Sequence, residues 1–313
     1  MAILSKMYFN AVFGALGGLL GWMLFGVLGE KTPASIDLNL LLGGAVIGGS
    51  IGYFVVSVEA IRDQSLIRFV RLASYGVLIA MVGGAIGMYV GDRLNEFLVH
   101  TFGNFLVLTM FARGLGWSLL GVAIGASEGI AARSLGKFSY GTIGGLLGGF
   151  IGGVLFELFY YFARQNLGTT YLWNALGLVI LGACIGSLSA LVQTVFLPAN
   201  VKVMRGWQEG REYPLDKALC LLGRDEHADI ALFRDMKIEK KHCYIKNVGG
   251  NRYVLVNNGA PPEFTRVNDE PVADQRELAD GDRVQLGSVI LKFQLRAAIH
   301  RGKKRPMATP SGT

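Results

Sequence analysis

Six apolar segments of about 20 residues each fill the first two thirds of the sequence, and they carry almost no charge. We place them at residues 8–29, 38–58, 72–91, 110–131, 140–163 and 173–197. A helix of about 20 residues spans the ~30 Å hydrocarbon core of a lipid bilayer. A hydrophobic content of 51%, with only 17% charged residues, is likewise too apolar for an ordinary soluble protein. The sequence therefore predicts an α-helical multipass membrane domain over residues 1–198.

Glycines recur at matching positions in these segments, and the pattern indicates a two-helix hairpin used three times. The odd spans share Gly-Gly-x-x-Gly at 17–21, 83–87 and 148–152, and the even spans share Gly-x-x-x-Gly at 44–48, 121–125 and 182–186. Small residues four apart let helix backbones approach closely, which is a main source of attraction between helices in lipid. We therefore assign the glycines to helix packing. A conduit along a central axis between the three hairpins is the alternative.

Lysine and arginine are unevenly distributed between the two sets of connections, and this bias sets the expected orientation. The connections after the second, fourth and sixth spans contain Arg62, Arg68, Arg71, Arg133, Lys137, Lys202 and Arg205. The opposite connections contain only Lys31, Arg93 and Arg164. Because the more basic side usually faces the cytoplasm, we expect both termini and the polar last third of the chain to be cytoplasmic.

Few charged residues lie within the spans. Arg113 is near the outer start of the fourth span and Glu157 is near the outer end of the fifth. Adjacent antiparallel helices would bring the two to the same depth, so we expect a buried ion pair. Glu59 and Glu128 lie near cytoplasmic ends, where we expect solvent to reach them. The segment 94–108 has apolar residues at helical spacing, which fits a helix on the outer surface or a longer, tilted fourth span.

Residues that would support catalysis or metal binding are not clustered. No chain of carboxylates or histidines indicates an ion relay, and His, Asp, Glu and Ser do not gather at reactive spacing. Cys184, Cys220 and Cys243 lie in unrelated settings, without the spacing of a metal site or a disulfide framework. We therefore expect no enzyme activity, no metal and no cofactor.

After Pro198 the pattern changes to period-two alternation interrupted by Gly, Asn and Asp. The segments 201–204, 253–256 and 289–293 are typical of short strands, and 249–251 and 280–282 are typical of the turns between them. This pattern predicts an all-β sandwich over residues 199–297. Residues 298–313 are predicted to be a basic, disordered tail, which would be attracted to anionic membrane lipid. We expect no nucleic-acid partner.

Specific residues of the sandwich resemble a known family. They include Leu222-Gly223-Arg224, the run from Asp229 to Ile238, His242, and Asp280-Gly281-Asp282. Together they are similar to a forkhead-associated (FHA) domain covering about the last third of the chain. The resemblance implies a domain that binds phosphothreonine peptides through loops at one end of the sandwich. In that family an Arg after a Gly and a Ser three residues before a His contact phosphate, and the Asn of an Asn-Gly-Thr motif grips the peptide backbone.

This sequence departs from the family pattern at two of those positions. Arg224 matches the arginine and His242 matches the histidine, which in the family holds the loops in place. Glu239 stands where the serine belongs. Glu263 stands where the asparagine belongs, two residues before the matching Thr265. A phosphate bound here would therefore face one or two carboxylates. Like charges about 4 Å apart repel by roughly 1 kcal/mol in water and roughly 4 kcal/mol at an effective dielectric near 20. Lys240 would offset part of this repulsion, as would the matched arginine.

The sequence thus predicts a membrane-anchored FHA-like binding module that acts as a scaffold or regulator, with phosphothreonine recognition weakened or lost. Its expected partner is a cytoplasmic protein or phosphoprotein, and a second copy of the chain is a further candidate. An FHA domain on a multipass protein without a recognisable targeting signal favours a bacterial plasma (inner) membrane. The alternative is a channel or transporter built from the three glycine-rich hairpins and regulated by its cytoplasmic FHA domain.

Overall fold

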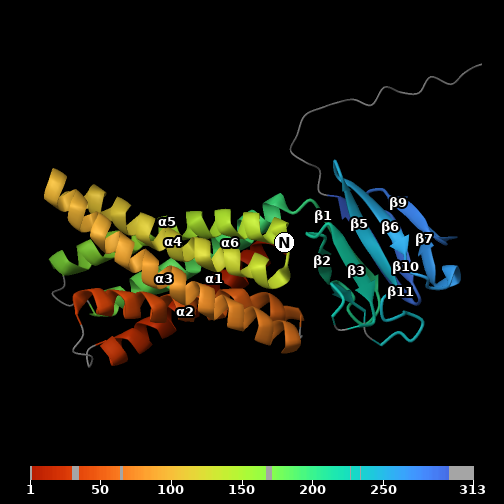
Figure 1. The fold of residues 1–313 in the computed structure, drawn as a ribbon, viewed down its shortest axis with the longest axis horizontal. Helices are drawn as coiled ribbons and strands as arrows, with labels where there is room; N and C mark the ends of the chain where they lie inside the picture. The colour runs from red at the N-terminus through yellow and green to blue at the C-terminus, as the bar shows by residue number, and fades with distance from the viewer. Residues whose placement is uncertain are drawn as a thin grey trace, which may run out of the picture. The chain divides into compact units, whose positions relative to one another are not determined.

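The computed structural model describes residues 2–29, 35–63, 66–166, 171–225, 227–232 and 234–295 (Figure 1). The chain divides into two compact units, Met1–Phe196 and Leu197–Thr313. The predicted basic tail at 298–313 lies outside the described residues, as do Lys31 and the side chains of Glu59, Arg62, Arg68 and Arg71.

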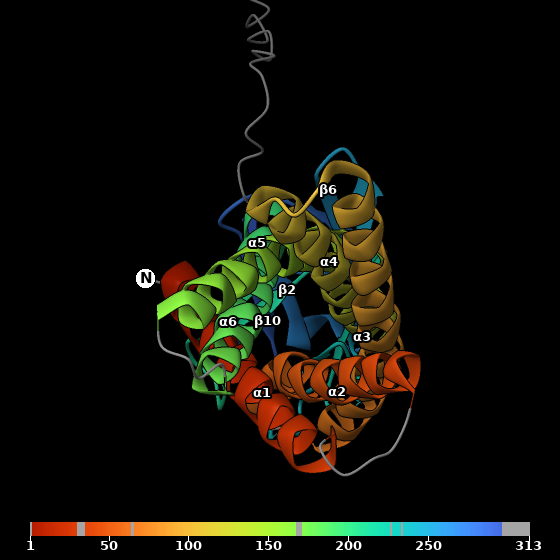
Figure 2. The ribbon, with the colours of Figure 1, turned by 90° about the vertical axis from the view of Figure 1, so that its left-hand side faces the viewer.

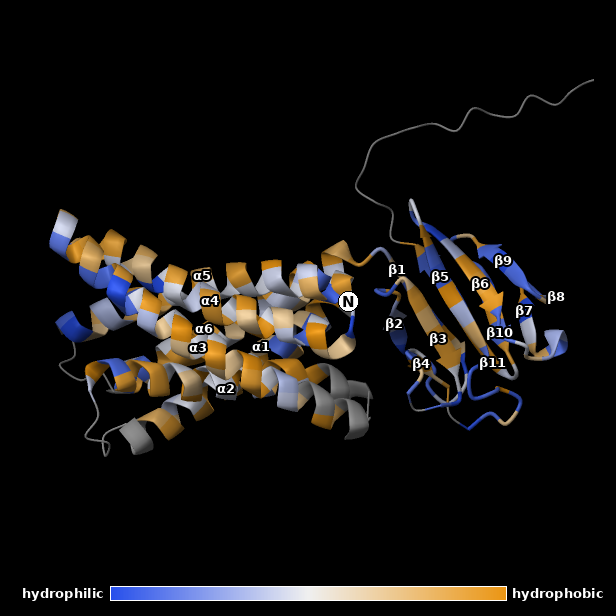
Figure 3. Ribbon diagram, viewed as in Figure 1, coloured by the Kyte–Doolittle hydropathy of each residue, from blue (hydrophilic) through white to orange (hydrophobic). Residues whose placement is uncertain are grey.

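The described residues of the first unit form six long helices. They are α1 (Ala2–Gly29), α2 (Ile36–Asp63), α3 (Leu66–Phe102), α4 (Leu106–Ala132), α5 (Leu135–Asn166) and α6 (Tyr171–Phe196). All six are long and apolar enough to cross a membrane. Figure 3 shows hydrophobic residues along most of their length, with hydrophilic residues gathered towards the helix ends.

The helices form a closed ring in which each one packs against its two neighbours in sequence and α6 packs against α1. Figure 2 shows this ring seen from one end. Glycines lie where the backbones approach most closely. A Cβ on Gly121 of α4 would overlap the carbonyl oxygen of Gly145 on α5, and a Cβ on Gly182 of α6 would overlap that of Gly14 on α1. The small residues therefore set the distance between neighbouring helices, as expected for packing in lipid.

Apolar side chains from alternate helices join in one buried cluster of this unit. Most of its buried members come from α2, α4 and α6, among them Ile47, Ile51, Leu120, Ile124, Leu181 and Ile185, and Ala80 of α3 joins them. Two of them, Ile124 and Ile185, occupy the same place in their Gly-x-x-x-Gly motifs as Ile47 does in α2. In each even helix, the isoleucine that precedes the second glycine of the motif is therefore buried in the interior of the ring.

Two expectations about this unit were wrong. Residues 94–102 form neither a surface helix nor part of the fourth span, because α3 continues through them to Phe102. The first interruption is Gly103, whose φ of 90° ends the helix. Glu128 is not solvated but buried, and its carboxylate accepts a hydrogen bond from the Gln193 amide on α6. A residue one turn from a helix end is still covered when the neighbouring helix extends alongside it.

The second unit is a β-sandwich. Its strands are β1 (Ala199–Arg205), β2 (Glu212–Pro214), β3 (Leu219–Gly223), β4 (Ile230–Ala231), β5 (Cys243–Gly249), β6 (Arg252–Asn257), β7 (Thr265–Val267), β8 (Glu270–Pro271), β9 (Gln275–Leu278), β10 (Arg283–Leu286) and β11 (Val289–Leu295), with a short 3₁₀ helix η1 (Pro262–Phe264). One sheet has the order β2-β1-β11-β10-β7-β8 and the other β4-β3-β5-β6-β9. Alternating residues of both sheets face one core, which includes Val201, Leu222, Leu255, Leu291 and Phe293. The predicted fold class, six apolar helices followed by an all-β sandwich, is confirmed.

Candidate functional site at the loop end of the β-sandwich

Three loops of the sandwich meet at a shallow, open depression. The loops follow β3, precede β5 and follow β6. The residues lining the depression are Arg224, Asp225, Glu239, Lys240, Lys241, Asn258 and Gly259. All three loops therefore contribute charged or amide groups to one surface.

Gly223, the last residue of β3, lets the first two loops lie against each other. A Cβ at this position would overlap the carbonyl oxygen of Lys240 and lie 3.1 Å from that of Glu239. Backbone hydrogen bonds close the contact, from the Arg224 N–H to the Glu239 carbonyl (2.9 Å) and from the Asp225 N–H to the Lys240 carbonyl (3.2 Å). The close approach fixes Arg224 beside Glu239 and Lys240. The Arg224 side chain extends to Met236, where Nη1 lies 2.7 Å from the Met236 sulfur.

His242 and Thr265 are fully buried and connect the loops beneath this surface. The His242 Nδ1 accepts a hydrogen bond from the Glu239 N–H (3.1 Å), and Nε2 lies 2.9 Å from the Thr265 Oγ1. Because Nδ1 is an acceptor, the neutral ring carries its proton on Nε2 and donates it to Thr265. Burial lowers the pKa of His242 below its usual value, which keeps the ring neutral.

The lowered pKa of His242 predicts a pH-dependent stability. The unfolded chain binds a proton on this histidine below about pH 6.5, whereas the folded domain resists it, so stability falls as the pH falls through that value. We expect the melting temperature of the β-sandwich unit to drop between pH 7 and pH 5.5, and to drop less in His242→Gln. An equal drop in both proteins would contradict this assignment, since the lowered pKa values of Asp225 and Asp235 act in a window near pH 4 and below.

The charges at the depression are mixed. Three cations, Arg224, Lys240 and Lys241, share it with the carboxylates of Asp225 and Glu239. The His227 backbone N–H donates to the Asp225 carboxylate (2.9 Å), and this bond is the main cause that lowers the pKa of Asp225. Asp225 is therefore ionised at neutral pH. An incoming phosphate would meet two negative groups beside the cations.

The structure brings together some of the residues expected from the sequence. Arg224, Glu239 and Lys240 line the depression, and His242 and Thr265 lie below it. Glu263 is in η1 and is not among the lining residues.

Four lining residues were not among the site residues expected from the sequence: Asp225, Lys241, Asn258 and Gly259. Asp225 directly follows Arg224, and this position next to the arginine could have identified it from the sequence. Asn258 offers a neutral amide in the third loop, with its Nδ2 donating to the Lys241 carbonyl (2.9 Å). The Asn258-Gly259 pair was visible in the sequence but is separated from Thr265 by a longer loop than the family motif has.

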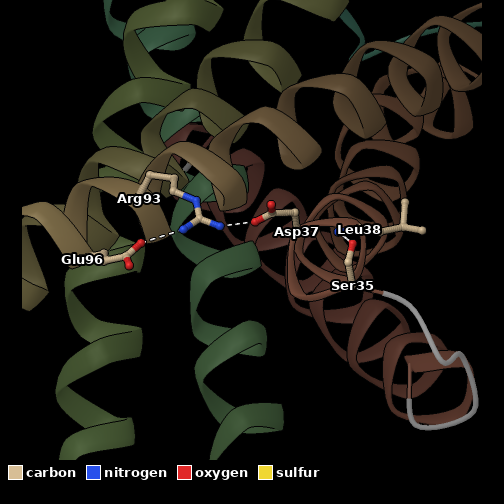
Figure 4. Close-up of polar contacts among 5 residues, drawn as sticks. All are labelled: Ser35, Asp37, Leu38, Arg93 and Glu96. Carbon is tan, nitrogen blue, oxygen red and sulfur yellow. Dashed lines mark hydrogen bonds and ion pairs between the residues drawn. The ribbon is translucent and has the colours of Figure 1, made fainter.

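Charged residues also gather at one end of the helical unit. Arg113 Nε lies 3.6 Å from a Glu157 oxygen, and Arg113 Nη2 lies 3.8 Å from Asp92 on α3. Figure 4 shows the neighbouring Arg93 guanidinium between the carboxylates of Asp37 on α2 and Glu96 on α3. These pairs link α2 to α3, and α4 to α3 and α5. Among the described residues, no group of three or more His, Cys, Asp or Glu side chains is placed to hold a metal ion.

Comparison with known proteins gives matches to the last third of the chain. The profile of a family described as "Inner membrane component of T3SS, cytoplasmic domain" matches residues 202–297. No curated protein sequence matches the chain.

Several solved structures are similar over the same region. The FHA domain of the CT664 protein from Chlamydia trachomatis is 26% identical, with 32% of this chain and 99% of that chain covered and a TM-score of 0.30. The FhaA FHA domain, solved in complex with the intracellular domain of Rv3910, is 27% identical, with 31% and 99% covered and a TM-score of 0.28. The N-terminal FHA domain of Rad53p from Saccharomyces cerevisiae, solved with a phosphothreonine peptide, is 17% identical, with 32% and 94% covered and a TM-score of 0.28. The sandwich is an FHA-like domain, as its motif residues predicted.

Proposed function

We propose that this chain is a membrane-anchored binding module of the inner membrane, whose FHA-like domain acts as a scaffold or regulator for a cytoplasmic protein partner. Six membrane-length helices and a sandwich that matches the cytoplasmic domain of an inner membrane component support the location. The basic bias of the connections supports cytoplasmic termini. The proposed role is binding, not catalysis.

The observation that carries the proposal is that two carboxylates, of Asp225 and Glu239, line the same depression as Arg224 at the loop end. The fold keeps the loops, the buried histidine and the arginine of an FHA domain, so the surface is organised for recognition. Asp225 and Glu239 nevertheless add negative charge where phosphate would bind. A phosphothreonine carries about −1.5 to −2 charges at neutral pH, so each carboxylate repels it. The proposed partner is therefore bound mainly without phosphate.

This proposal predicts weak phosphopeptide binding that a single substitution improves. The full chain in nanodiscs would be titrated with a phosphothreonine peptide library by fluorescence polarisation. We expect wild-type binding in the millimolar range, a free energy of about −4 kcal/mol. Glu239→Ser removes a repulsion of roughly 1–4 kcal/mol and should tighten binding at least about fivefold.

The matched control for this test is Glu277→Ser. Glu277 is an exposed carboxylate on β9 and does not line the depression. Its replacement should leave phosphopeptide affinity unchanged. Micromolar binding by the wild-type protein that is lost in Arg224→Ala would overturn the proposed loss of phosphate recognition and make the domain a phosphopeptide reader.

We also propose that the helical unit is built from three glycine-rich hairpins and serves as an anchor. Equivalent glycines support the repeat, because Gly48, Gly125 and Gly186 each lie against the backbone of the next helix around the ring. The buried isoleucines and leucines of α2, α4 and α6 support an anchor over a conduit. Apolar side chains without polar partners offer nothing to replace the hydration shell of a permeating ion.

A further inference from the structure

Trp207 is an exposed tryptophan at the loop end of the sandwich. It lies in the turn after β1 and is 60% exposed. The Arg234 guanidinium carbon lies only 3.5 Å from the centre of its ring, a cation–π stack that holds both side chains in place. Arg234 adopts a positive φ of 71°, which is costly for a residue with a side chain. The stack is therefore held by the fold at some cost in backbone energy.

The segment that carries Arg234 is anchored rigidly to the sandwich. The Asp235 Oδ2 accepts hydrogen bonds from the Ser288 N–H (2.6 Å) and hydroxyl (2.7 Å), and Oδ1 accepts one from the Lys237 N–H (2.9 Å). Ile238 follows and is fully buried in the core. The three hydrogen bonds to the Asp235 carboxylate thus hold the turn in place. The side chains of Arg234 and Met236, on either side of Asp235, are exposed on this fixed backbone.

Met236 extends this surface towards the depression. Its side chain is 80% exposed, and its sulfur contacts the Arg224 guanidinium at 2.7 Å. The segment from Arg234 to Met236 thus places two contacts close together: a guanidinium stacked on an aromatic ring, and a flexible apolar side chain against a second guanidinium. Tryptophan and arginine are the residues most enriched at binding hot spots, and exposed methionine adapts to partners of varied shape.

We propose that Trp207, Arg234 and Met236, here called the Trp207 platform, dock an unphosphorylated, acidic segment of a partner protein that carries a large apolar side chain. The inference rests on the proposed function and identifies the kind of partner. Charge decides the occupant. Arg224, Arg234 and Lys237 supply three positive charges near this surface. The Asp235 carboxylate is engaged by Ser288 and Lys237, which leaves the exposed Glu209 beside Trp207 and Glu239 in the adjoining depression.

Two other occupants fit less well. Residues 296–313 of this chain contain two Lys and three Arg but no Asp or Glu, so this segment would be repelled. An anionic lipid surface is attracted to arginine, but it would be repelled by the carboxylates of Asp225 and Glu239 in the adjoining depression. A protein segment, unlike a lipid surface, can place its acidic residues near Arg234 and away from the carboxylates of Asp225 and Glu239.

The test uses the full chain in phosphatidylcholine nanodiscs. The probes are a library of unphosphorylated 12-residue peptides, each with Asp and Glu around one Trp, Phe, Leu or Met, and the same peptides with Lys in place of the acids. Peptide affinity would be measured together with the ¹⁹F NMR signal of protein labelled with 5-fluorotryptophan. Trp207 is the only tryptophan after residue 196, so its signal is the one that reports on the sandwich. We expect acidic peptides alone to bind and to shift the Trp207 signal. Trp207→Ala and Arg234→Ala should each weaken binding at least about tenfold.

Leu219→Ala is the matched control, since Leu219 is 47% exposed at the opposite end of β3 from the loops. It should leave affinity unchanged, and Trp207→Phe should retain most of it. Peptide binding that survives Trp207→Ala but is lost in Arg224→Ala would overturn the platform and leave the proposed function standing. Binding of phosphorylated peptides alone, or of no peptide, would overturn both. A Trp207 signal that moves only with phosphatidylserine vesicles would assign the surface to lipid and overturn the inference.

Discussion

Replacing Gly48 by alanine is expected to disrupt the packing of α2 on α3. A Cβ at Gly48 would overlap the carbonyl oxygen of Ala80 and lie 3.0 Å from the Cα of Gly84, and both are backbone atoms that cannot move aside alone. Forcing an extra methyl group into a packed interface costs about 1–3 kcal/mol, and we expect the upper end here. The measurement is the midpoint of thermal unfolding in detergent, followed by fluorescence-detected size exclusion.

The neighbouring Gly49→Ala supplies the control for this experiment. A Cβ at Gly49 would meet the Met81 side chain, with Cγ at 2.7 Å, and a methionine can adopt another rotamer. Its unfolding midpoint should therefore stay near the wild-type value. If the two alanine variants were equally stable, close backbone contact would not be what holds α2 against α3.

The second large effect is expected at His242 in the sandwich. His242→Ala removes a fully buried ring, and it leaves the Glu239 N–H and the Thr265 hydroxyl without their hydrogen-bond partners. Each unsatisfied buried group costs about 1–3 kcal/mol, so we expect a total loss of about 3 kcal/mol or more in the free energy of unfolding. Urea unfolding of the β-sandwich unit would measure it.

His227→Ala is the comparison for that loss. Its side chain is 64% exposed, and its ring contacts Asp225 in the same loop. A change within about 0.5 kcal/mol is expected, as for most surface substitutions. A small effect of His242→Ala would mean that the loops keep their positions without the histidine, and the arrangement of Arg224 and Glu239 would need another cause.

The elements that the sequence predicted well depend on local pattern. Apolar runs of membrane length gave the six helices, and period-two alternation with turn residues gave the sandwich. The error at residues 94–102 has a physical reason. Helical spacing of apolar residues shows which face of a helix is buried, but it does not show whether the helix bends into the membrane surface or continues straight. Only Gly103 marks an end, and α3 runs to it.

The parts that the sequence could not predict depend on contacts between distant residues. Glu128 and Gln193 are 65 positions apart, and their hydrogen bond exists because α4 and α6 both contribute to the interior of a closed ring. Asn258 reaches the depression because its backbone N–H donates to the His242 carbonyl and its side-chain amide donates to the Lys241 carbonyl. Spacing along the chain does not show which distant residues come into contact, because these contacts form where separate helices or loops meet in the folded protein.

The closed ring has a consequence for how the chain can be ordered. Because α6 lies antiparallel to α1, with Gly186 beside Asn10 and Gly182 beside Gly14, the end of the last helix is close to the start of the first. A short link between them would resemble the hairpin connections already present. A circularly permuted chain that begins at α3 or α5 should then form the same ring, and so should separate hairpins that assemble. The reason is that the contact between α6 and α1 is of the same kind as the contacts between helices that follow each other in sequence.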